Sequence, residues 1–222
     1  MGQIRVISRS AAPFVDRQEA GRLLADSMSH LMDTHAVVLG IPRGGVAVAA
    51  ELARRLRAEL DIVLSRKLRA PGQPELAMGA VSEDGHVLLN KDVVEALDIK
   101  PDTIERERTF QLSEIERRGR LFRGTRKRMP LKGRIVIVTD DGVATGATFR
   151  SALDACRHES PSRLIAALPV APEGAIQDIA AAADELICLR VPPFFNAVGQ
   201  FYVRFEQLED DDVIKLLQLS TP

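Results

Sequence analysis

The sequence has few cysteines and no excess of either charge. Its two cysteines, Cys156 and Cys188, lie far apart and lack the spacing of metal ligands. We therefore expect reduced, packed thiols rather than a redox pair. Thirty basic residues against 31 acidic ones give a formal charge of -1. Bulk charge thus directs the chain toward neither nucleic acid nor an anionic membrane.

Long apolar runs are missing as well. No stretch approaches the roughly 18 consecutive apolar residues of a membrane span, and the first residues lack the apolar segment of a signal peptide. The four histidines form no HxxxH or HxH pattern. We expect a cytoplasmic protein without a membrane partner. With 222 residues, 45% of them hydrophobic, the chain can bury one core, which predicts a single domain over 1–222.

Short apolar runs alternate with stripes of apolar residues at helical spacing. The runs predict strands at 36–41, 61–65, 135–138, 164–170 and 185–191, and the stripes predict helices near 17–31, 44–56, 101–122, 146–157 and 172–183. Asp84-Gly85 between two apolar runs predicts a hairpin. The pattern is typical of an α/β fold: a mostly parallel twisted sheet of about five strands flanked by helices, with ligands at the carboxyl ends of the strands.

The stretch IVIVTDDGVATGAT (135–148) ends a buried strand on two carboxylates and continues into small residues. The strand brings Asp140 and Asp141 to the carboxyl edge of the sheet. The small residues leave room for backbone N–H groups to surround an anion at the start of the next helix. A phosphate beside a ribose diol would satisfy both halves of the motif. The alternative is an ordinary turn with an acidic helix cap.

A second strand end, GIPRGGV (40–46), is a candidate for another anion loop. Arg43 supplies a fixed positive fork, and Gly44 and Gly45 let the backbone approach a ligand closely. Taken alone, the segment fits a plain helix-starting turn equally well. Its pairing with the first motif favours a ligand loop.

TDDGVATGAT after IVIV resembles the 5-phosphoribosyl-1-pyrophosphate (PRPP) motif of the type I phosphoribosyltransferases. The resemblance implies a core at about 34–190 and a small C-terminal hood at about 191–222. It places the 5′-phosphate on 143–148, the ribose hydroxyls on the acidic pair, and pyrophosphate on 40–46. The PRPP-binding residues are then Arg43, Gly44, Gly45, Asp140, Asp141, Gly142, Val143, Ala144, Thr145, Gly146, Ala147 and Thr148.

The segment SRKLRAPGQPELAMGAV (65–81) carries Arg66 and Lys67 at a predicted strand end. Its two prolines and the glycine between them argue against a regular helix or central strand. We expect a mobile flap, because these transferases resemble one another in closing a basic loop over the leaving pyrophosphate. A solvated basic loop is the alternative.

Loss of pyrophosphate from the ribose builds positive charge on the sugar. The predicted catalytic residues are Lys67 and Arg66 at the leaving group and Asp140 and Asp141 beside the ribose. The expected cofactor is Mg²⁺, held near Asp140 and Asp141 largely through oxygens of the substrate and water.

The acceptor is less defined by the sequence. Transferases for 6-oxopurines usually have aspartate where Ala144 stands, and adenine transferases resemble this chain more closely there. The hood candidate VPPFFNAVGQFY (191–202) holds four of the nine aromatic residues. Phe194 and Phe195 can stack on a flat base, with plain hood packing as the alternative. We expect a nitrogen nucleophile of nucleobase type.

The stretch 117–134 contains nine basic residues and no acidic one. Contact with RNA is one interpretation and a solvated helix end is the other. The stretch supports a second hypothesis, a non-enzymatic PRPP-binding regulator that acts on RNA or DNA. We also expect a homo-oligomer, a dimer, and a final helix capped by the acidic segment 209–212.

Overall fold

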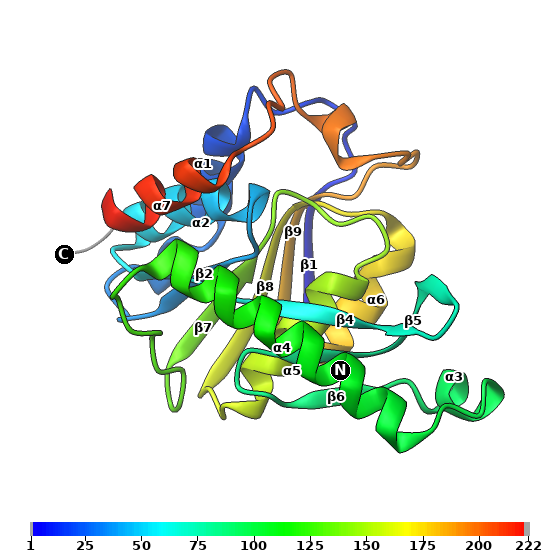
Figure 1. Cartoon of the computed structure of the whole chain (residues 1–222). Coiled ribbons are helices and arrows are strands. Elements are labelled where there is room, and N and C mark those ends of the chain that lie inside the picture. Colours follow the sequence, from blue (N-terminus) through cyan, green and yellow to red (C-terminus); the bar gives the residue numbers. More distant parts are fainter. Residues whose placement is uncertain (1, 220–222) are drawn as a thin grey trace.

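A computed structural model describes residues 2–219 (Figure 1). Six parallel strands form the central sheet in the order β1-β9-β8-β7-β2-β3. These strands are β1 (Gln3–Ser8), β2 (Val37–Gly40), β3 (Glu59–Ile62), β7 (Ile135–Thr139), β8 (Arg163–Val170) and β9 (Glu185–Arg190). The parallel α/β prediction is confirmed, with one strand more than expected. β1 was not predicted because this edge strand is only partly buried and lacks a continuous apolar run.

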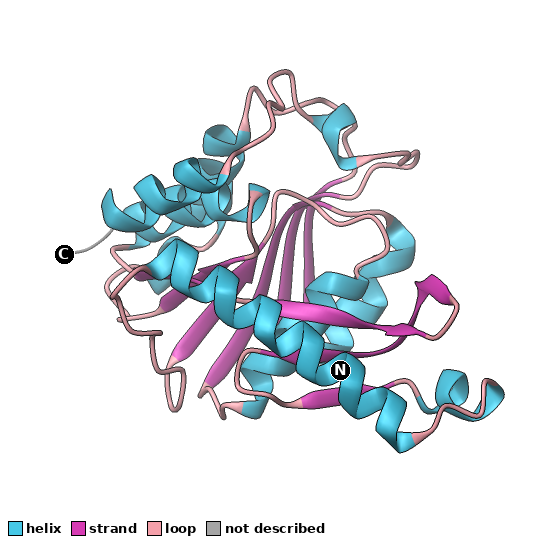
Figure 2. Ribbon diagram, in the orientation of Figure 1, coloured by secondary structure: helices cyan, strands magenta, loops and turns pink. Residues whose placement is uncertain are grey.

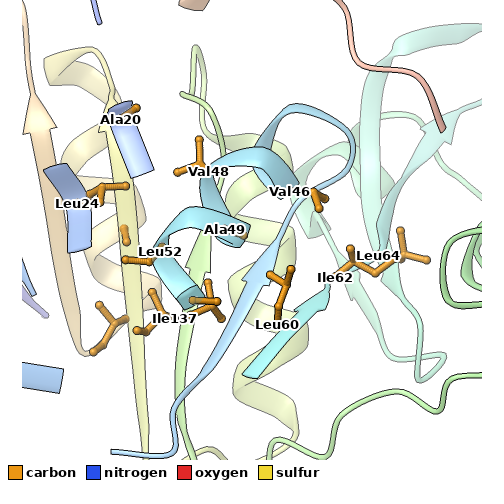
Figure 3. Close-up of a cluster of buried hydrophobic side chains, with 14 of the residues drawn as sticks. Ala20, Leu24, Val46, Val48, Ala49, Leu52, Leu60, Ile62, Leu64 and Ile137 are labelled. Atoms are coloured by element: carbon orange, nitrogen blue, oxygen red, sulfur yellow. The ribbon is translucent and has the colours of Figure 1, made fainter. Parts of the chain in front are cut away.

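Helices cover both faces of this sheet (Figure 2). On one face lie α5 (Ala147–His158) and α6 (Glu173–Ala182), which share a core with strands β7 and β8. On the other face lie α1 (Arg17–Ser27) and α2 (Gly44–Leu56). Figure 3 shows part of this second core, where apolar residues of α1 and α2 pack on β3 and β7. Both cysteines are buried free thiols, as predicted.

A second, three-stranded antiparallel sheet contains the segment expected to be a flap. It consists of β4 (Ser65–Ala70), β5 (Gln73–Ser82) and β6 (Val87–Leu89). The prediction that proline and glycine exclude a central strand here was wrong, because β5 is the middle strand of this sheet. Pro71 and Gly72 occupy the turn between β4 and β5, where Gly72 has φ +70°. The Asp84-Gly85 hairpin is confirmed, since Val81 pairs with Val87 across it.

The helix α4 (Pro101–Arg123) crosses in front of this small sheet and follows the short α3 (Lys91–Ala96). Residues 191–209 then run over the top of the molecule beside the chain segment 9–16 and include the 3-10 turn η2 (Val198–Phe201). Another 3-10 turn, η1 (Ser29–Leu31), follows α1. The chain continues into α7 (Asp210–Leu219), which packs on α2 and α4.

Within residues 2–219, no helix combines the length and the apolar character needed to cross a bilayer.

Candidate active site

The two predicted anion loops lie side by side at the carboxyl edge of the central sheet. β2 and β7 are neighbours, and Gly40 pairs with Thr139 at their ends. The backbone N–H of Ile41 donates to the carbonyl of Thr139 at 3.1 Å. The segments 41–45 and 140–146 therefore leave the sheet next to each other, as two loops that bind one ligand would have to do.

The glycines of the first loop pack directly against the carboxylates of the second. A Cβ atom added to Gly44 would lie 1.9 Å from Asp141 Oδ2, and one added to Gly45 would lie 2.8 Å from Asp140 Oδ1. Both distances are too short for a real carbon. The loop needs glycine here because the start of α2 touches the acidic pair.

Burial raises the pKa of both carboxylates of the acidic pair. Burial raises the pKa of Asp140 well above its usual value, and the neighbouring charge of Asp141 raises it further. Burial also raises the pKa of Asp141, whereas the guanidinium of Arg17 opposes that rise. Burial thus disfavours charge on both carboxylates, and Arg17 favours the charged form of Asp141.

Arg17, the first residue of α1, forms an ion pair with Asp141. Its Nε and Nη2 atoms both lie 2.8 Å from Asp141 Oδ2, and the side chains are only 11% and 14% exposed. Its Nη1 donates to the carbonyl of Glu206 at 2.8 Å. Its guanidinium carbon lies 3.9 Å from the centre of the Phe205 ring. Arg17 therefore joins the acidic pair to the segment after η2.

Tyr202 makes a second link between that segment and the acidic pair. Its hydroxyl donates to the backbone carbonyl of Asp141 at 2.5 Å. Its ring stacks on Phe205 at 5.0 Å and meets Phe14 at 5.4 Å. Burial and the charge of Asp141 raise the pKa of Tyr202, so the phenol stays neutral and remains a donor.

Arg17 and Tyr202 were not predicted as site residues. The sequence around Arg17 was interpreted only as a helix start, and the structure confirms that Asp16 caps α1 by accepting from the N–H of Glu19 at 2.9 Å. One signal was present: a cation at the first position of a helix opposes the helix dipole. A residue that disfavours its own helix in this way indicates that it makes a contact elsewhere in the fold.

Close packing fixes the two glycines of the predicted phosphate loop. A Cβ atom on Gly142 would lie 2.7 Å from a methyl group of Val198 and 2.9 Å from one of Val170. Gly146 precedes α5 with φ +78°, a left-handed conformation that favours glycine. The hood therefore rests directly on the start of the loop, and its end is shaped for the helix that follows.

Of the remaining loop residues, one is buried and four are exposed. Val143 is 5% exposed, and its N–H donates to the carbonyl of Val170 at 3.1 Å. That N–H is thus used within the fold, so Val143 holds the loop in place. The exposed members are Ala144, Thr145, Ala147 and Thr148.

Arg43 lies at the other loop, after a cis Pro42–Arg43 peptide bond. Its Nη1 contacts Glu209 Oε2 at 3.2 Å and Asp210 Oδ1 at 3.8 Å, at the start of α7. The acidic segment 209–212 also caps α7 as predicted, because Asp212 accepts from the N–H of Glu209. An anionic ligand at Arg43 would compete with these carboxylates.

Arg66 and Lys67 point to opposite sides of the small sheet because strand neighbours alternate. Arg66 Nε donates to the buried Gln111 of α4 at 2.5 Å. Burial and the nearby charge of Arg118 lower the pKa of Arg66. Lys67 is exposed and lies on the other face of β4 from Arg66. β4 also contacts α5, the helix that begins at the phosphate loop.

The two predicted acceptor residues differ in their surroundings. Phe195 packs on Phe201 with 5.1 Å between ring centres. This contact agrees with the alternative prediction that the residue packs within the hood. Phe194 is 82% exposed. Phe194 is therefore the one with a free ring face.

Four of the nine basic residues in the stretch 117–134 bind other parts of the fold. Arg123 is 9% exposed and contacts Asp61 at 2.7 Å, Glu83, and the carbonyl of Ile62 at 2.8 Å. The other arginines of the stretch with partners elsewhere in the fold are Arg126, Arg128 and Arg134. Neither sequence interpretation, an RNA contact or a solvated helix end, describes these side chains. They tie α4 and the following loop to the sheet.

A family model for the phosphoribosyl transferase domain matches residues 16–206. Two proteins of Mycobacterium tuberculosis, Rv0571c of strain H37Rv and MT0597 of strain CDC 1551, are 45% identical over 204 residues, 92% of this chain. Both are named provisionally as phosphoribosyl transferases. The match covers 46% of each relative, so this chain spans about half of their length.

The crystal structure of TT1426 from Thermus thermophilus is similar over nearly the whole chain. It is 42% identical, with a TM-score of 0.85, over 95% of this chain and 100% of the other. The family match over residues 16–206 includes both loops, the acidic pair, Arg17 and Tyr202. The chain therefore belongs to the phosphoribosyl transferase family, as its PRPP-like motif predicted.

Proposed function

We propose that this domain transfers the 5-phosphoribosyl group of PRPP to a nitrogen nucleophile and releases pyrophosphate. The observation that carries the proposal is the contact of the Gly44-Gly45 turn with Asp140 and Asp141, which brings two loops suited to anions together around two carboxylates. A bare phosphate site needs no carboxylates. A molecule with a phosphate, a diol and a pyrophosphate uses every part of the arrangement.

In this proposal the 5′-phosphate binds the exposed backbone and hydroxyl groups of 144–148 at the start of α5. The ribose 2′ and 3′ hydroxyls donate to Asp140 and Asp141. The pyrophosphate lies at 41–45, where Arg43 exchanges its contact with Glu209 for the ligand. Lys67 stabilises negative charge that develops on the leaving group.

Magnesium fits the residues at this edge. Asp140 and Asp141 offer the oxygen ligands that Mg²⁺ prefers. Across residues 2–219, no three His, Cys, Asp or Glu side chains gather as a metal site. We infer that Asp140 and Asp141 would hold the ion together with substrate oxygens and water. When bound, Mg²⁺ neutralises charge on the pyrophosphate.

The acceptor we propose is a planar, nucleobase-like nitrogen nucleophile. Ala144 is exposed and offers no carboxylate to a purine N7, whereas the exposed ring of Phe194 offers a stacking face. The regulatory alternative rested on the basic stretch, and four arginines of that stretch contact other parts of the fold. We further expect a homodimer that works in the cytoplasm.

The test is a substrate panel with a matched inactive variant. Purified protein is offered PRPP, Mg²⁺ and a set of bases and amines while pyrophosphate release is measured. The control is Asp140→Asn/Asp141→Asn, which keeps size and polarity but removes both charges. We expect turnover in the wild type that the double variant loses nearly completely. Equal PRPP affinity of the two proteins by calorimetry would refute the role of the carboxylates.

A further inference from the structure

A groove of about 630 Å³ lies along β1, the outermost strand of the central sheet. Its lining residues come from β1, from α1, from the segment between them and from the end of β9. β9 is the strand beside β1 (Figure 1). Arg5 and Ile7 are two residues apart on β1, so their side chains lie on the same face of the strand, and both line this groove. At a sheet edge the covering helix reaches such side chains only partly, which leaves them accessible to a ligand.

The middle of the groove is apolar. Phe14 and Leu189 are 0% and 6% exposed and form its floor. Ile7 and Leu23 are 51% and 39% exposed and form its sides. Large apolar side chains scattered singly over a surface need no explanation, but two that line the same hollow favour an apolar guest.

Arg5 supplies a cation at one end. Its Nη2 donates to the carbonyl of Ser27. Its Nε is buried and has no hydrogen-bond partner among the described residues, and Arg5 forms no ion pair with any of them. Of the described residues that line the groove, none is acidic. Among residues 2–219, no carboxylate therefore pairs with Arg5, which favours an anionic ligand.

The other end carries hydroxyl groups and a second guanidinium. The Oγ atoms of Ser8 and Ser10 accept from backbone N–H groups at 3.0 and 3.1 Å, so their hydroxyl protons remain to be donated. Arg190 lies 3.6 Å over the ring of Phe14 and donates to the carbonyl of Ala12. Burial lowers the pKa of Arg190, and the negative charge of Glu19 opposes that shift. The uncompensated charge thus lies at the Arg5 end.

We propose that this groove binds a small amphipathic organic anion, an aliphatic carboxylate. The carboxylate would pair with Arg5, and the aliphatic body would lie between Ile7 and Leu23. The inference does not depend on the reaction proposed above, because neither Arg5 nor Leu23 belongs to that site.

The experiment uses octanoate as the probe and calorimetry on the full chain. We expect saturable binding at one site, weakened about tenfold or more in Arg5→Met, because a charged hydrogen bond is lost. Leu23→Ser should weaken binding through the loss of apolar contact. Arg54→Met, which changes an exposed arginine outside the groove, should bind as the wild type does. Octyl glucoside, with the same chain and no charge, should bind much more weakly than octanoate.

Three outcomes would overturn the proposal. They are no saturable binding of octanoate at millimolar concentration, equal binding in the wild type and both groove variants, and equal binding of octyl glucoside. A fourth is a stable dimer in sedimentation that Ile7→Asp dissociates, since a second copy of the chain would then cover the groove. Circular dichroism checks that each variant is folded. Leu23 is on the surface, so its replacement keeps the test decisive if Arg5→Met does not fold.

Discussion

Replacing Arg17 by methionine removes the cation that pairs with Asp141 while it keeps an unbranched side chain. The two side chains are 11% and 14% exposed, so solvent screens the pair little. Breaking a buried ion pair from one side leaves an uncompensated charge and typically costs about 3–5 kcal/mol. We expect Arg17→Met to lose about 3 kcal/mol of unfolding free energy at pH 8, the low end because both groups retain some contact with solvent.

The loss should shrink as the pH falls. Burial raises the pKa of Asp141 and Arg17 opposes that rise, so removing Arg17 lets the pKa rise further. A carboxyl whose pKa is higher in the folded protein binds a proton more tightly when folded. The unfolding free energy therefore increases as the pH falls through the folded pKa toward the unfolded value of about 3.9. At pH 5 the variant should recover part of its deficit.

Urea denaturation at pH 8 and pH 5 measures both effects. The matched control is Arg54→Met, since the Arg54 side chain that contacts Glu51 is 67% exposed, and its loss should change stability by less than about 1 kcal/mol. In the double variant Arg17→Met/Asp141→Asn the loss should be smaller than the sum of the single losses. A deficit of Arg17→Met no larger than that of the control, or one that is constant from pH 8 to pH 5, would refute the reasoning.

Three further predictions concern the proposed reaction. Lys67→Ala should lower turnover more than PRPP affinity, by roughly 2–4 kcal/mol in the transition state, and an unchanged rate constant in steady-state kinetics would exclude Lys67 from the mechanism. Amides of 69–77 should exchange faster than those of the central sheet and become protected with PRPP, so slow exchange in the free protein would contradict a lid. Gly44→Ala should destabilise the fold by about 1–3 kcal/mol through its clash with Asp141. The control Gly174→Ala has nothing within 4 Å of the new Cβ, and an equal effect of both in thermal unfolding would exclude the clash.

The central sheet could be predicted because its inner strands are continuous apolar runs. β2, β7, β8 and β9 are buried on both faces, and such strands differ from amphipathic helices in length and in residue type. β1 lacks this signal because one edge and part of both faces meet solvent. The small sheet was mispredicted for another reason. Proline and glycine were weighed as strand breakers, whereas in a hairpin their effect depends on whether they fall at the turn.

In the candidate site, too, local sequence patterns could be predicted, whereas contacts between distant segments could not. Asp140 and the Gly44-Gly45 turn could be predicted together, because neighbouring parallel strands end at one edge and each loop carries its own local pattern. Arg17 lies 124 positions before Asp141, and neither segment contains a sequence pattern that predicts their contact. Their pairing depends on where α1 docks on the sheet, and docking is decided by packing such as that of Leu24 in the core.

The hood makes the final connection, because Tyr202 bonds to Asp141 where the chain pairs with Phe14, and Phe205 packs on Arg17. The backbone N–H of Phe14 donates to the carbonyl of Phe201 at 2.8 Å, and that of Val203 donates to the carbonyl of Phe14 at 2.8 Å. The hood is thus held by the segment that starts α1. The segment 201–206 is therefore joined both to the start of α1 and, through Arg17, to the carboxylate of Asp141.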